Sequence, residues 1–139
     1  MICIAISDRS IDKCLELANG EELAEIRMDM CRLEKNEVEK LFSTAKAKLI
    51  ATCREDGYSQ AERKELLTAA IKSGAAYADI EYEAPQSFKD EIIKVAHQHR
   101  CDVIVSYHNF EATPSRSRLK HIKQQCYKMG GQVAKLATW

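Results

Sequence analysis

Short hydrophobic runs alternate along this chain with longer segments of helical periodicity. The runs are rich in β-branched residues, and each has the length of a strand: residues 2–6, 23–28, 48–53, 77–81, 102–107 and 132–137. In the segments between them, hydrophobic positions recur three or four residues apart, as at Leu66, Leu67 and Ala70. This spacing predicts five amphipathic helices, each with one buried stripe.

Residues that favour helix ends fall between these segments. Ser59 and Glu62 have the spacing of a capping box, which predicts a helix start at this point. Thr113 followed by Pro114 predicts a second start, with threonine as N-cap and proline as the first helical residue. Gly130 suits the end of the last helix.

Strand and helix therefore alternate from residue 1 to residue 139, which predicts one α/β domain with a parallel sheet. Such units either form an open, doubly wound sheet or close into an eight-stranded barrel. The chemically interesting residues fall within or at the carboxyl ends of successive strands, where barrel enzymes carry their sites. We therefore expect a (β/α)8 TIM-barrel type of fold, incomplete here, with about six strands and five helices.

Composition and charge narrow the classes of function. The chain has 21 basic and 21 acidic side chains, so its net charge is zero, and neither sign forms a block suited to nucleic acid or an anionic membrane. No stretch approaches the roughly 20 apolar residues that a bilayer requires. We expect a cytoplasmic protein that binds no nucleic acid and no membrane, with its six cysteines as reduced thiols.

Charged side chains occur within the predicted strands. Glu25 and Arg27 are two residues apart, so both point to one face of their strand, and Arg54 ends the next strand. Glu25 and Arg27 form either a structural interior ion pair or part of a site. The two guanidinium groups are suited to holding a carboxylate substrate. Glu81 ends the fourth strand, either in a polar layer of the barrel or in the site.

A lysine and a histidine supply candidate reactive groups. Lys135 lies inside an apolar strand, and His108 lies at the end of the strand before it. Burial and nearby arginines both favour the neutral amine of a lysine, which is the form that attacks a carbonyl. A histidine passes protons in both directions near neutral pH. We expect imine chemistry beside a ketone and no metal site, because the histidines and cysteines have no familiar ligand spacing.

Five short motifs together resemble the type I 3-dehydroquinate dehydratases, in order and over essentially the whole chain. They are Glu25-Ile-Arg27-x-Asp29, Thr52-Cys53-Arg54, Asp79-Ile80-Glu81, Ser106-Tyr107-His108-Asn109-Phe110-x-x-Thr113-Pro114 and Val133-Ala134-Lys135-Leu136-Ala137. The resemblance implies that Lys135 is the Schiff-base lysine and His108 the general acid/base. It also implies that Glu25, Arg27 and Arg54 bind the substrate.

The resemblance implies the dehydration of 3-dehydroquinate to 3-dehydroshikimate in the shikimate pathway, without a cofactor. Either Glu55 or Asp56 is expected to orient His108, as an acid in this loop does in the family. Ala5 replaces a serine that helps some relatives to bind substrate. The family's last two strands, with an arginine and a lid loop, have no counterpart in these residues, so we expect exposed sheet edges. Because type I enzymes are often dimers, the resemblance also implies a homodimer.

Two other functions remain open at this point. A class I aldolase would share the imine, but the residues around His108 argue against it. A non-catalytic half-barrel or an open α/β binding module is the alternative from a different class.

Overall fold

The computed structural model describes residues 2–139, in which six strands alternate with six helices. The strands are β1 (Cys3–Ile6), β2 (Leu23–Arg27), β3 (Lys48–Thr52), β4 (Tyr77–Glu81), β5 (Asp102–Asn109) and β6 (Val133–Thr138). The helices are α1 (Ile11–Asn19), α2 (Met28–Cys31), α3 (Lys35–Thr44), α4 (Gln60–Lys72), α5 (Gln86–Gln98) and α6 (Arg116–Lys128). All six predicted strands are confirmed to within two residues at each end.

Two details of the predicted helices are wrong. Helix α2 was not expected, because its four residues are too few to carry a helical period; it ends at Arg32, whose φ of 57° is left-handed. Helix α6 begins two residues later than predicted, because the hydroxyl of Ser115 accepts the capping hydrogen bond from the Arg118 amide. The predicted cap, Thr113, instead interacts with Thr138 of β6.

Helix α4 begins as its sequence predicts. The Ser59 hydroxyl accepts a hydrogen bond from the Glu62 amide, and the Glu62 carboxylate accepts one from the Ser59 amide. This reciprocal pair satisfies two amides that the first helical turn leaves unpaired. The hydroxyl of Ser59 also lowers the pKa of Glu62, because it donates to the ionised carboxylate. Helix α4 therefore starts at a fixed point, just after the loop that follows β3.

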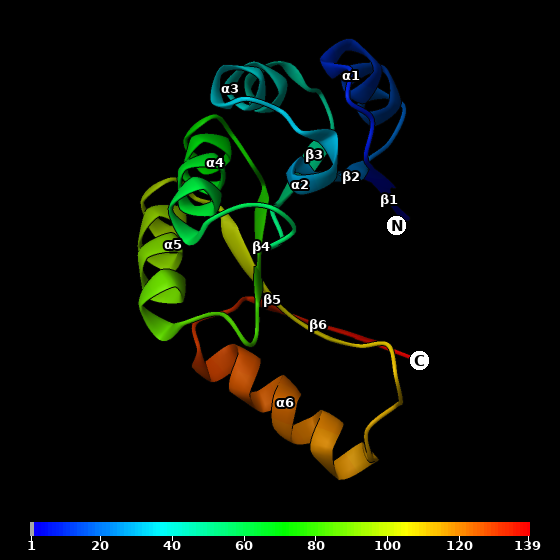
Figure 1. The fold of residues 1–139 in the computed structure, drawn as a ribbon, viewed down its shortest axis with the longest axis vertical. Coiled ribbons are helices and arrows are strands. Elements are labelled where there is room, and N and C mark those ends of the chain that lie inside the picture. The colour runs from blue at the N-terminus through cyan, green and yellow to red at the C-terminus, as the bar shows by residue number, and fades with distance from the viewer. Residues whose placement is uncertain (1) are drawn as a thin grey trace.

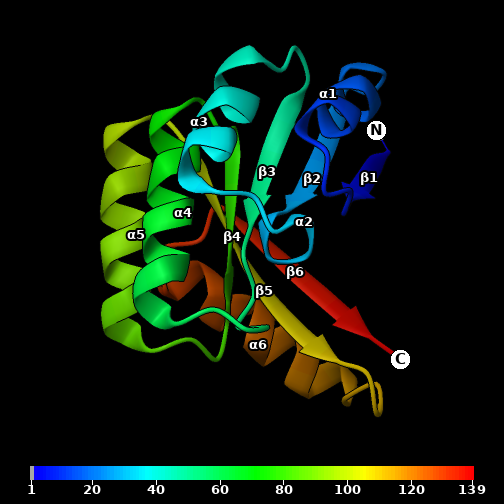
Figure 2. The same cartoon turned by 45° about the horizontal axis from the view of Figure 1, so that its top comes forward.

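The strands form one parallel sheet in the order β1-β2-β3-β4-β5-β6. Figure 1 and Figure 2 show helices α3 to α6 around the outside of this curved sheet. A doubly wound sheet would reverse its strand order and carry helices on both faces, so the sequential order identifies the barrel topology. The predicted barrel-type architecture is confirmed, with one more helix than expected.

The hydrophobic core lies between the sheet and its helices. Side chains alternate across each strand, so Ala24 and Ile26 of β2 are fully buried under the helices while Glu25 and Arg27 face the concave side. Ile80 of β4 and Ile92 of α5 are also fully buried. Each such isoleucine contributes about 1.5–3 kcal/mol through burial. The helical side of the sheet thus supplies the stability that holds the concave side in shape.

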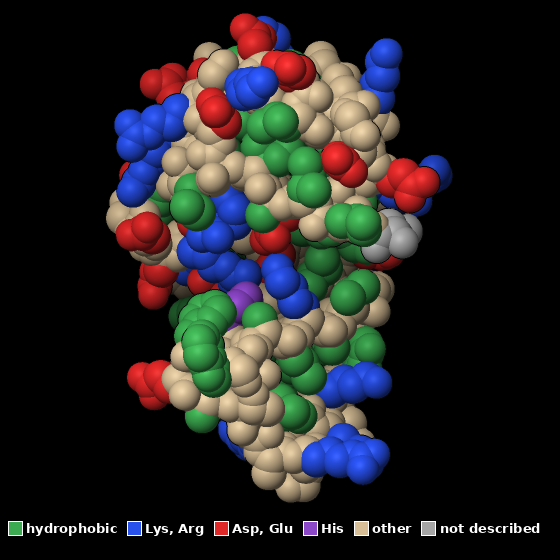
Figure 3. Space-filling view, turned by 90° about the vertical axis from the view of Figure 1, so that its right-hand side faces the viewer, with side chains coloured by type: hydrophobic (Ala, Val, Ile, Leu, Met, Phe, Trp, Pro, Cys, Tyr) green, Lys and Arg blue, Asp and Glu red, His purple; other side chains and the backbone are tan. Residues whose placement is uncertain are grey.

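The concave side is open between β1 and β6. Each of these strands pairs with one neighbour within residues 2–139. Figure 3 views this open side, on which hydrophobic side chains run over the lower half and charged side chains gather across the hollowed middle. The concave face is therefore accessible from solvent, and the site described below lies on it. Within residues 2–139, no helix has the length and hydropathy to cross a membrane.

Candidate functional site

The parallel register brings polar side chains of successive strands onto the concave face. Ser106 of β5 is in register with Lys135 of β6 on one side and with Glu81 of β4 on the other. Partners in register on a parallel sheet point to the same face. Positions within or at the carboxyl ends of these strands therefore bring their polar side chains together on one face, as the sequence predicted.

Lys135 lies between two carboxylates. Its Nζ is 3.3 Å from Asp79 Oδ2 and 3.4 Å from Glu25 Oε1. Glu25 also accepts a 2.8 Å hydrogen bond from the Thr52 hydroxyl. The charged groups nearest the amine are thus carboxylates, whereas we expected arginines; Arg54 stands one group further away, on the other side of Asp79.

Asp79 is fully buried, and its two oxygens have different partners. Oδ1 accepts a 2.6 Å hydrogen bond from the Ser106 hydroxyl and lies 3.0 Å from Arg54 Nη2, while Oδ2 faces Lys135. Asp79 stands two residues before Glu81 in the same strand, which is the alternation that places it on the concave face. That spacing was visible in the sequence, yet sequence reasoning assigned Asp79 no role.

Arg54 is held by three groups at once. Besides Asp79, its Nη1 donates a 3.1 Å hydrogen bond to Ser106 Oγ and lies 3.7 Å from Glu81 Oε1. A planar guanidinium with several donors suits this kind of multiple contact. Arg54 therefore has a fixed orientation at the end of β3, with 17% of its side chain exposed toward the pocket.

Arg27 pairs with Asp29 and not with Glu25. Its Nε and Nη2 lie 3.1 and 2.6 Å from the two carboxylate oxygens of Asp29, which is fully buried at the start of α2. The hydrogen bonds to Asp29 raise the pKa of Arg27. The interior ion pair between Glu25 and Arg27 that the sequence left open is therefore not formed, and the unexpected helix α2 supplies the partner.

His108 is the last residue but one of β5 and lies on the same face. Partial burial lowers the pKa of its imidazole, and the positive charge of Arg54 lowers it further, so the ring is neutral at neutral pH. The ring of Phe110 lies against it at a centroid distance of 5.8 Å. A neutral imidazole is able to accept a proton, which is what a general base requires.

The expected orienting acid does not reach His108. Within residues 2–139, neither Glu55 nor Asp56 forms a hydrogen bond or an ion pair with it. Glu55 is 84% exposed and lies 3.9 Å from Arg63, and the Asp56 carbonyl accepts a hydrogen bond from Arg32. Among the described residues, the short loop after β3 thus leaves both carboxylates without a contact to His108.

Arg63 of α4 supports the site from behind and was missed in the sequence. It is 3% exposed, donates a 3.0 Å hydrogen bond to the Cys53 carbonyl and forms an ion pair with Glu81. Its guanidinium also stacks on the ring of Phe88. Arg63 joins the ends of β3 and β4, and a charged residue within an otherwise buried helical stripe was the sequence feature that marked it.

One pocket gathers the predicted site residues. It has a volume of about 340 Å³ and is lined by Glu25, Arg27, Arg54, Glu81, Glu83, His108, Phe110 and Lys135. All five residues that the sequence singled out for catalysis or substrate binding are among them. A cavity of this size suits a small molecule, and its amine, imidazole and guanidinium groups are suited to a substrate with a ketone and a carboxylate.

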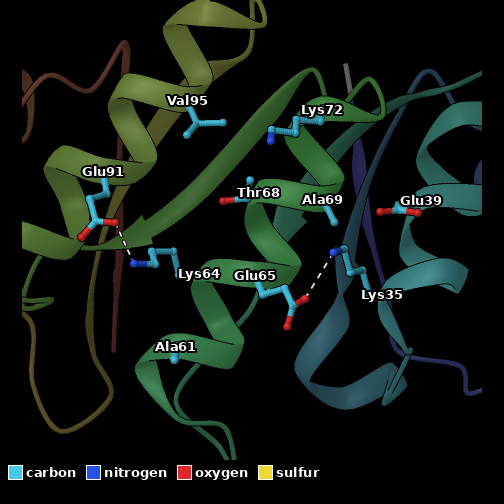
Figure 4. A pocket seen from close by; sticks show the side chains of 10 residues that line it. All are labelled: Lys35, Glu39, Ala61, Lys64, Glu65, Thr68, Ala69, Lys72, Glu91 and Val95. Carbon is cyan, nitrogen blue, oxygen red and sulfur yellow. Dashed lines mark hydrogen bonds and ion pairs between the residues drawn. The ribbon is translucent and has the colours of Figure 1, made fainter.

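A second hollow, of about 350 Å³, lies on the helical face between α3, α4 and α5. Figure 4 shows its side chains on the outward surfaces of these helices. Lys64 pairs with Glu91 at 2.7 Å, and Lys35 pairs with Glu65 at 3.3 Å. This hollow is lined by solvated ion pairs, and it lies on the helical side of the sheet, opposite the concave face. We therefore assign the chemistry to the concave pocket.

Neither metal nor disulfide chemistry is indicated for the described residues. Within residues 2–139, no group of three or more His, Cys, Asp or Glu side chains is arranged to hold a metal ion. All six cysteines are free thiols. Burial raises the pKa of Cys53 and of Cys101 to about 12, so both thiols are protonated and unreactive at neutral pH.

Comparison with known proteins gives a consistent result. The family model for Type I 3-dehydroquinase matches residues 2–139. The 3-dehydroquinate dehydratase of Methanocaldococcus jannaschii is 32% identical over 99% of this chain and 66% of its own length. That of Methanosarcina barkeri is 34% identical over 92% of this chain and 60% of its own length. The chain thus spans about 60–66% of the length of these relatives.

Solved structures of the same name share the fold. The type I 3-dehydroquinate dehydratase of Clostridium difficile, with covalently modified comenic acid, superimposes with a TM-score of 0.87 at 19% identity, covering 98% of this chain and 61% of that one. The enzyme of Aquifex aeolicus gives a TM-score of 0.84 at 24% identity, covering 99% and 66%. At these identities the likeness concerns the fold.

The fold and the site define a barrel-type α/β protein with a lysine within one parallel strand and a histidine near the carboxyl end of its neighbour. Among the families with this architecture, one agrees with the motifs, the family model and the relatives. The chain belongs to the type I 3-dehydroquinase family.

Proposed function

We propose that the concave pocket is the Schiff-base site of a 3-dehydroquinate dehydratase, a hydro-lyase of the shikimate pathway. The observation that carries this proposal is that Lys135 and His108, from neighbouring strands, line one pocket together with Glu25, Arg27 and Arg54. The names of the relatives support the choice of substrate. An aldolase reading gains no support, because no observation in this pocket favours it.

In the proposed reaction, the neutral amine of Lys135 adds to the substrate ketone, and uptake of one proton with loss of water gives an iminium ion, which releases that proton again when it is hydrolysed. The iminium withdraws electrons from the adjacent carbon, so that its proton becomes acidic. His108 removes that proton and then donates it to the departing hydroxyl group, which leaves as water. Hydrolysis of the iminium consumes one water and returns the lysine and 3-dehydroshikimate. The iminium itself is the electron sink, so the proposal includes no cofactor.

The pocket provides a role for each remaining site residue. Arg27 and Arg54 supply guanidinium groups for the substrate carboxylate and hydroxyls, and both are oriented in advance by buried aspartates. Glu25 stands on one side of the lysine amine. It accepts hydrogen bonds from donors on the substrate or on the amine. The binding roles of Glu25, Arg27 and Arg54 are part of the proposal.

The test is intact-protein mass spectrometry after incubation of the purified chain with 3-dehydroquinate and borohydride. We expect an adduct that depends on the substrate and is absent from Lys135→Ala. Lys123→Ala, which removes an exposed lysine from α6, is the matched control and should retain the adduct. Growth of the dehydroshikimate absorbance then measures turnover. A folded chain that forms no adduct would leave the second candidate, a binding module without catalysis.

We also propose that the chain forms a homodimer. The support is the resemblance to the type I family, whose members are often dimers, and Val133, which is 38% exposed on β6. Light scattering coupled to size-exclusion chromatography gives the mass directly. A monomer at micromolar concentration would contradict the proposal. The cytoplasmic location expected from the sequence stays a prediction.

A further inference from the structure

We propose that Asp79 is a positioning residue for Lys135. Asp79 holds the lysine amine in the pocket and fixes the position of that amine relative to Arg54. The inference rests on the proposed Schiff-base function of this pocket, and it assigns a role to a side chain that does not itself line the pocket. The supporting observation is that one Asp79 oxygen contacts Ser106 and Arg54, while the other contacts the amine of Lys135.

The fixed side of Asp79 consists of short contacts within the sheet. Ser106 donates to Oδ1 at 2.6 Å, and Arg54 Nη2 lies 3.0 Å from the same oxygen. The side chain of Asp79 has no solvent exposure, and Ser106 has none either. A buried carboxylate with these two partners has one orientation available to it. Its second oxygen is therefore directed at a defined point on the concave face.

That point is occupied by the amine of Lys135, 3.3 Å from Oδ2. Lys135 is a long, flexible side chain on β6, which pairs with one strand within the described residues. Without a fixed partner its four-carbon chain would sample many rotamers. Glu25 is the other contact, at 3.4 Å, but it is longer than aspartate and 14% exposed, so it is held less firmly. Asp79 is the rigid member of the pair.

Positioning the amine matters because attack on a ketone requires a defined approach, and a displacement of about 1 Å can cost roughly 100-fold in rate. Arg54 touches the same carboxylate. If Arg54 holds the substrate, Asp79 fixes the distance between the group that binds and the group that attacks. The carboxylate thus acts on the reaction through Lys135 and Arg54, without touching the substrate.

Asp79→Asn separates this role from a purely structural one. The asparagine Oδ1 is still able to accept from Ser106 and Arg54, so the fixed side is preserved. Its amide nitrogen then replaces Oδ2 opposite Lys135 and cannot accept a hydrogen bond from an ammonium group. Asp102→Asn is the matched control, because it removes an exposed aspartate from the other end of the neighbouring strand β5.

Two reactions of Lys135 are measured by mass spectrometry in folded wild type, Asp79→Asn and Asp102→Asn. In the first, borohydride traps the adduct with 3-dehydroquinate, which requires an oriented amine. In the second, formaldehyde and cyanoborohydride methylate lysines, and Lys135 is compared with the exposed Lys123 in the same sample. Formaldehyde needs no oriented approach, and in Asp79→Asn the amine is released from its hydrogen bond to Asp79 Oδ2 and is freer to react.

We expect opposite changes in Asp79→Asn, namely a loss of roughly tenfold or more in trapping and a gain in methylation of Lys135 relative to Lys123. Unchanged rates, or changes that equal those of Asp102→Asn, would overturn the inference while leaving the Schiff-base function intact. A wild type that traps no adduct would refute the proposed function. The methylation ratio would still decide whether Asp79 holds the amine.

A second variant covers the case in which Asp79→Asn does not fold. Ser106→Ala removes one of the two fixed partners of Asp79 but keeps its charge beside Lys135. In a folded sample we expect trapping to fall by a smaller factor than tenfold, with methylation of Lys135 unchanged. Trapping equal to that of wild type in Ser106→Ala would overturn the inference.

Discussion

Ser106 of β5 donates a 2.6 Å hydrogen bond to Asp79 of β4, and both side chains are fully buried although they face the pocket side of the sheet. This hydrogen bond links β5 to β4 and gives each of the two buried polar side chains a partner. Among residues 2–139, no buried side-chain nitrogen or oxygen lacks a hydrogen-bond partner. The polar layer under the pocket is thus complete before any ligand binds, which is the condition for a preorganised site.

Ser106→Ala should destabilise the protein by about 1–3 kcal/mol, because it leaves a buried carboxylate oxygen with one partner fewer. Urea unfolding followed by circular dichroism measures the change. Ser87→Ala, at an exposed position in α5, is the control and should stay within about 0.5 kcal/mol of wild type. Equal stability of the two variants would mean that the bond to Asp79 contributes nothing.

The protein should lose stability as the pH falls from about 7 to about 5, and His108 should contribute to the loss. Its pKa is lowered in the folded state, so the unfolded chain binds a proton first, below the ordinary histidine pKa of about 6.5. The stability that neutral His108 contributes is fully present above a pH of about 6.5. It is lost as the pH falls from there through the lower pKa of His108 in the folded state. The urea midpoint at pH 7 and at pH 5 reports it.

His108→Gln should reduce this pH dependence, because it removes the proton-binding group. His121→Gln removes an exposed imidazole from α6 and serves as the comparison. If both variants showed the same difference between pH 7 and pH 5, the contribution of His108 would be refuted.

Arg63→Met should cost about 1–3 kcal/mol, because it leaves the Cys53 carbonyl and the Glu81 carboxylate without a buried donor. The expected loss is moderate since Glu81 keeps Arg54 at 3.7 Å. Differential scanning calorimetry gives the shift in Tm. Arg118→Met on the exposed face of α6 is the matched change, and a Tm as low in this control as in Arg63→Met would contradict the prediction.

Gly131→Ala should destabilise the chain by about 1–3 kcal/mol through overpacking. A methyl group at Gly131 would lie 2.8 Å from Val105 Cγ2 and 3.0 Å from the Cys126 carbonyl. At Gly20 the nearest atom, the Leu17 carbonyl oxygen, would be 3.6 Å away, so Gly20→Ala should be neutral or slightly stabilising. The two urea midpoints are compared, and a Gly131→Ala variant as stable as Gly20→Ala would contradict the prediction.

The sequence by itself determined the strands, five of the helices and the face on which the site lies. These features depend on local periodicity, because alternate residues of a strand share a face and residues three or four apart share a helix face. The order of strands and helices placed Glu25, Arg54, His108 and Lys135 within or at the carboxyl ends of successive parallel strands. The resemblance of the motifs to one family then assigned their roles, and the family model bears out the assignment of the chain to it.

Only the tertiary structure decided which charged groups are partners. Arg27 binds Asp29 through an unexpected turn of helix, Lys135 lies between Glu25 and Asp79, and Glu55 lies near Arg63. The partners of Lys135 are 110 and 56 residues away in the sequence. Local periodicity fixes the face of a side chain, but ion pairs depend on register, strand curvature and the reach of long side chains. Those three quantities exist only once the sheet has formed.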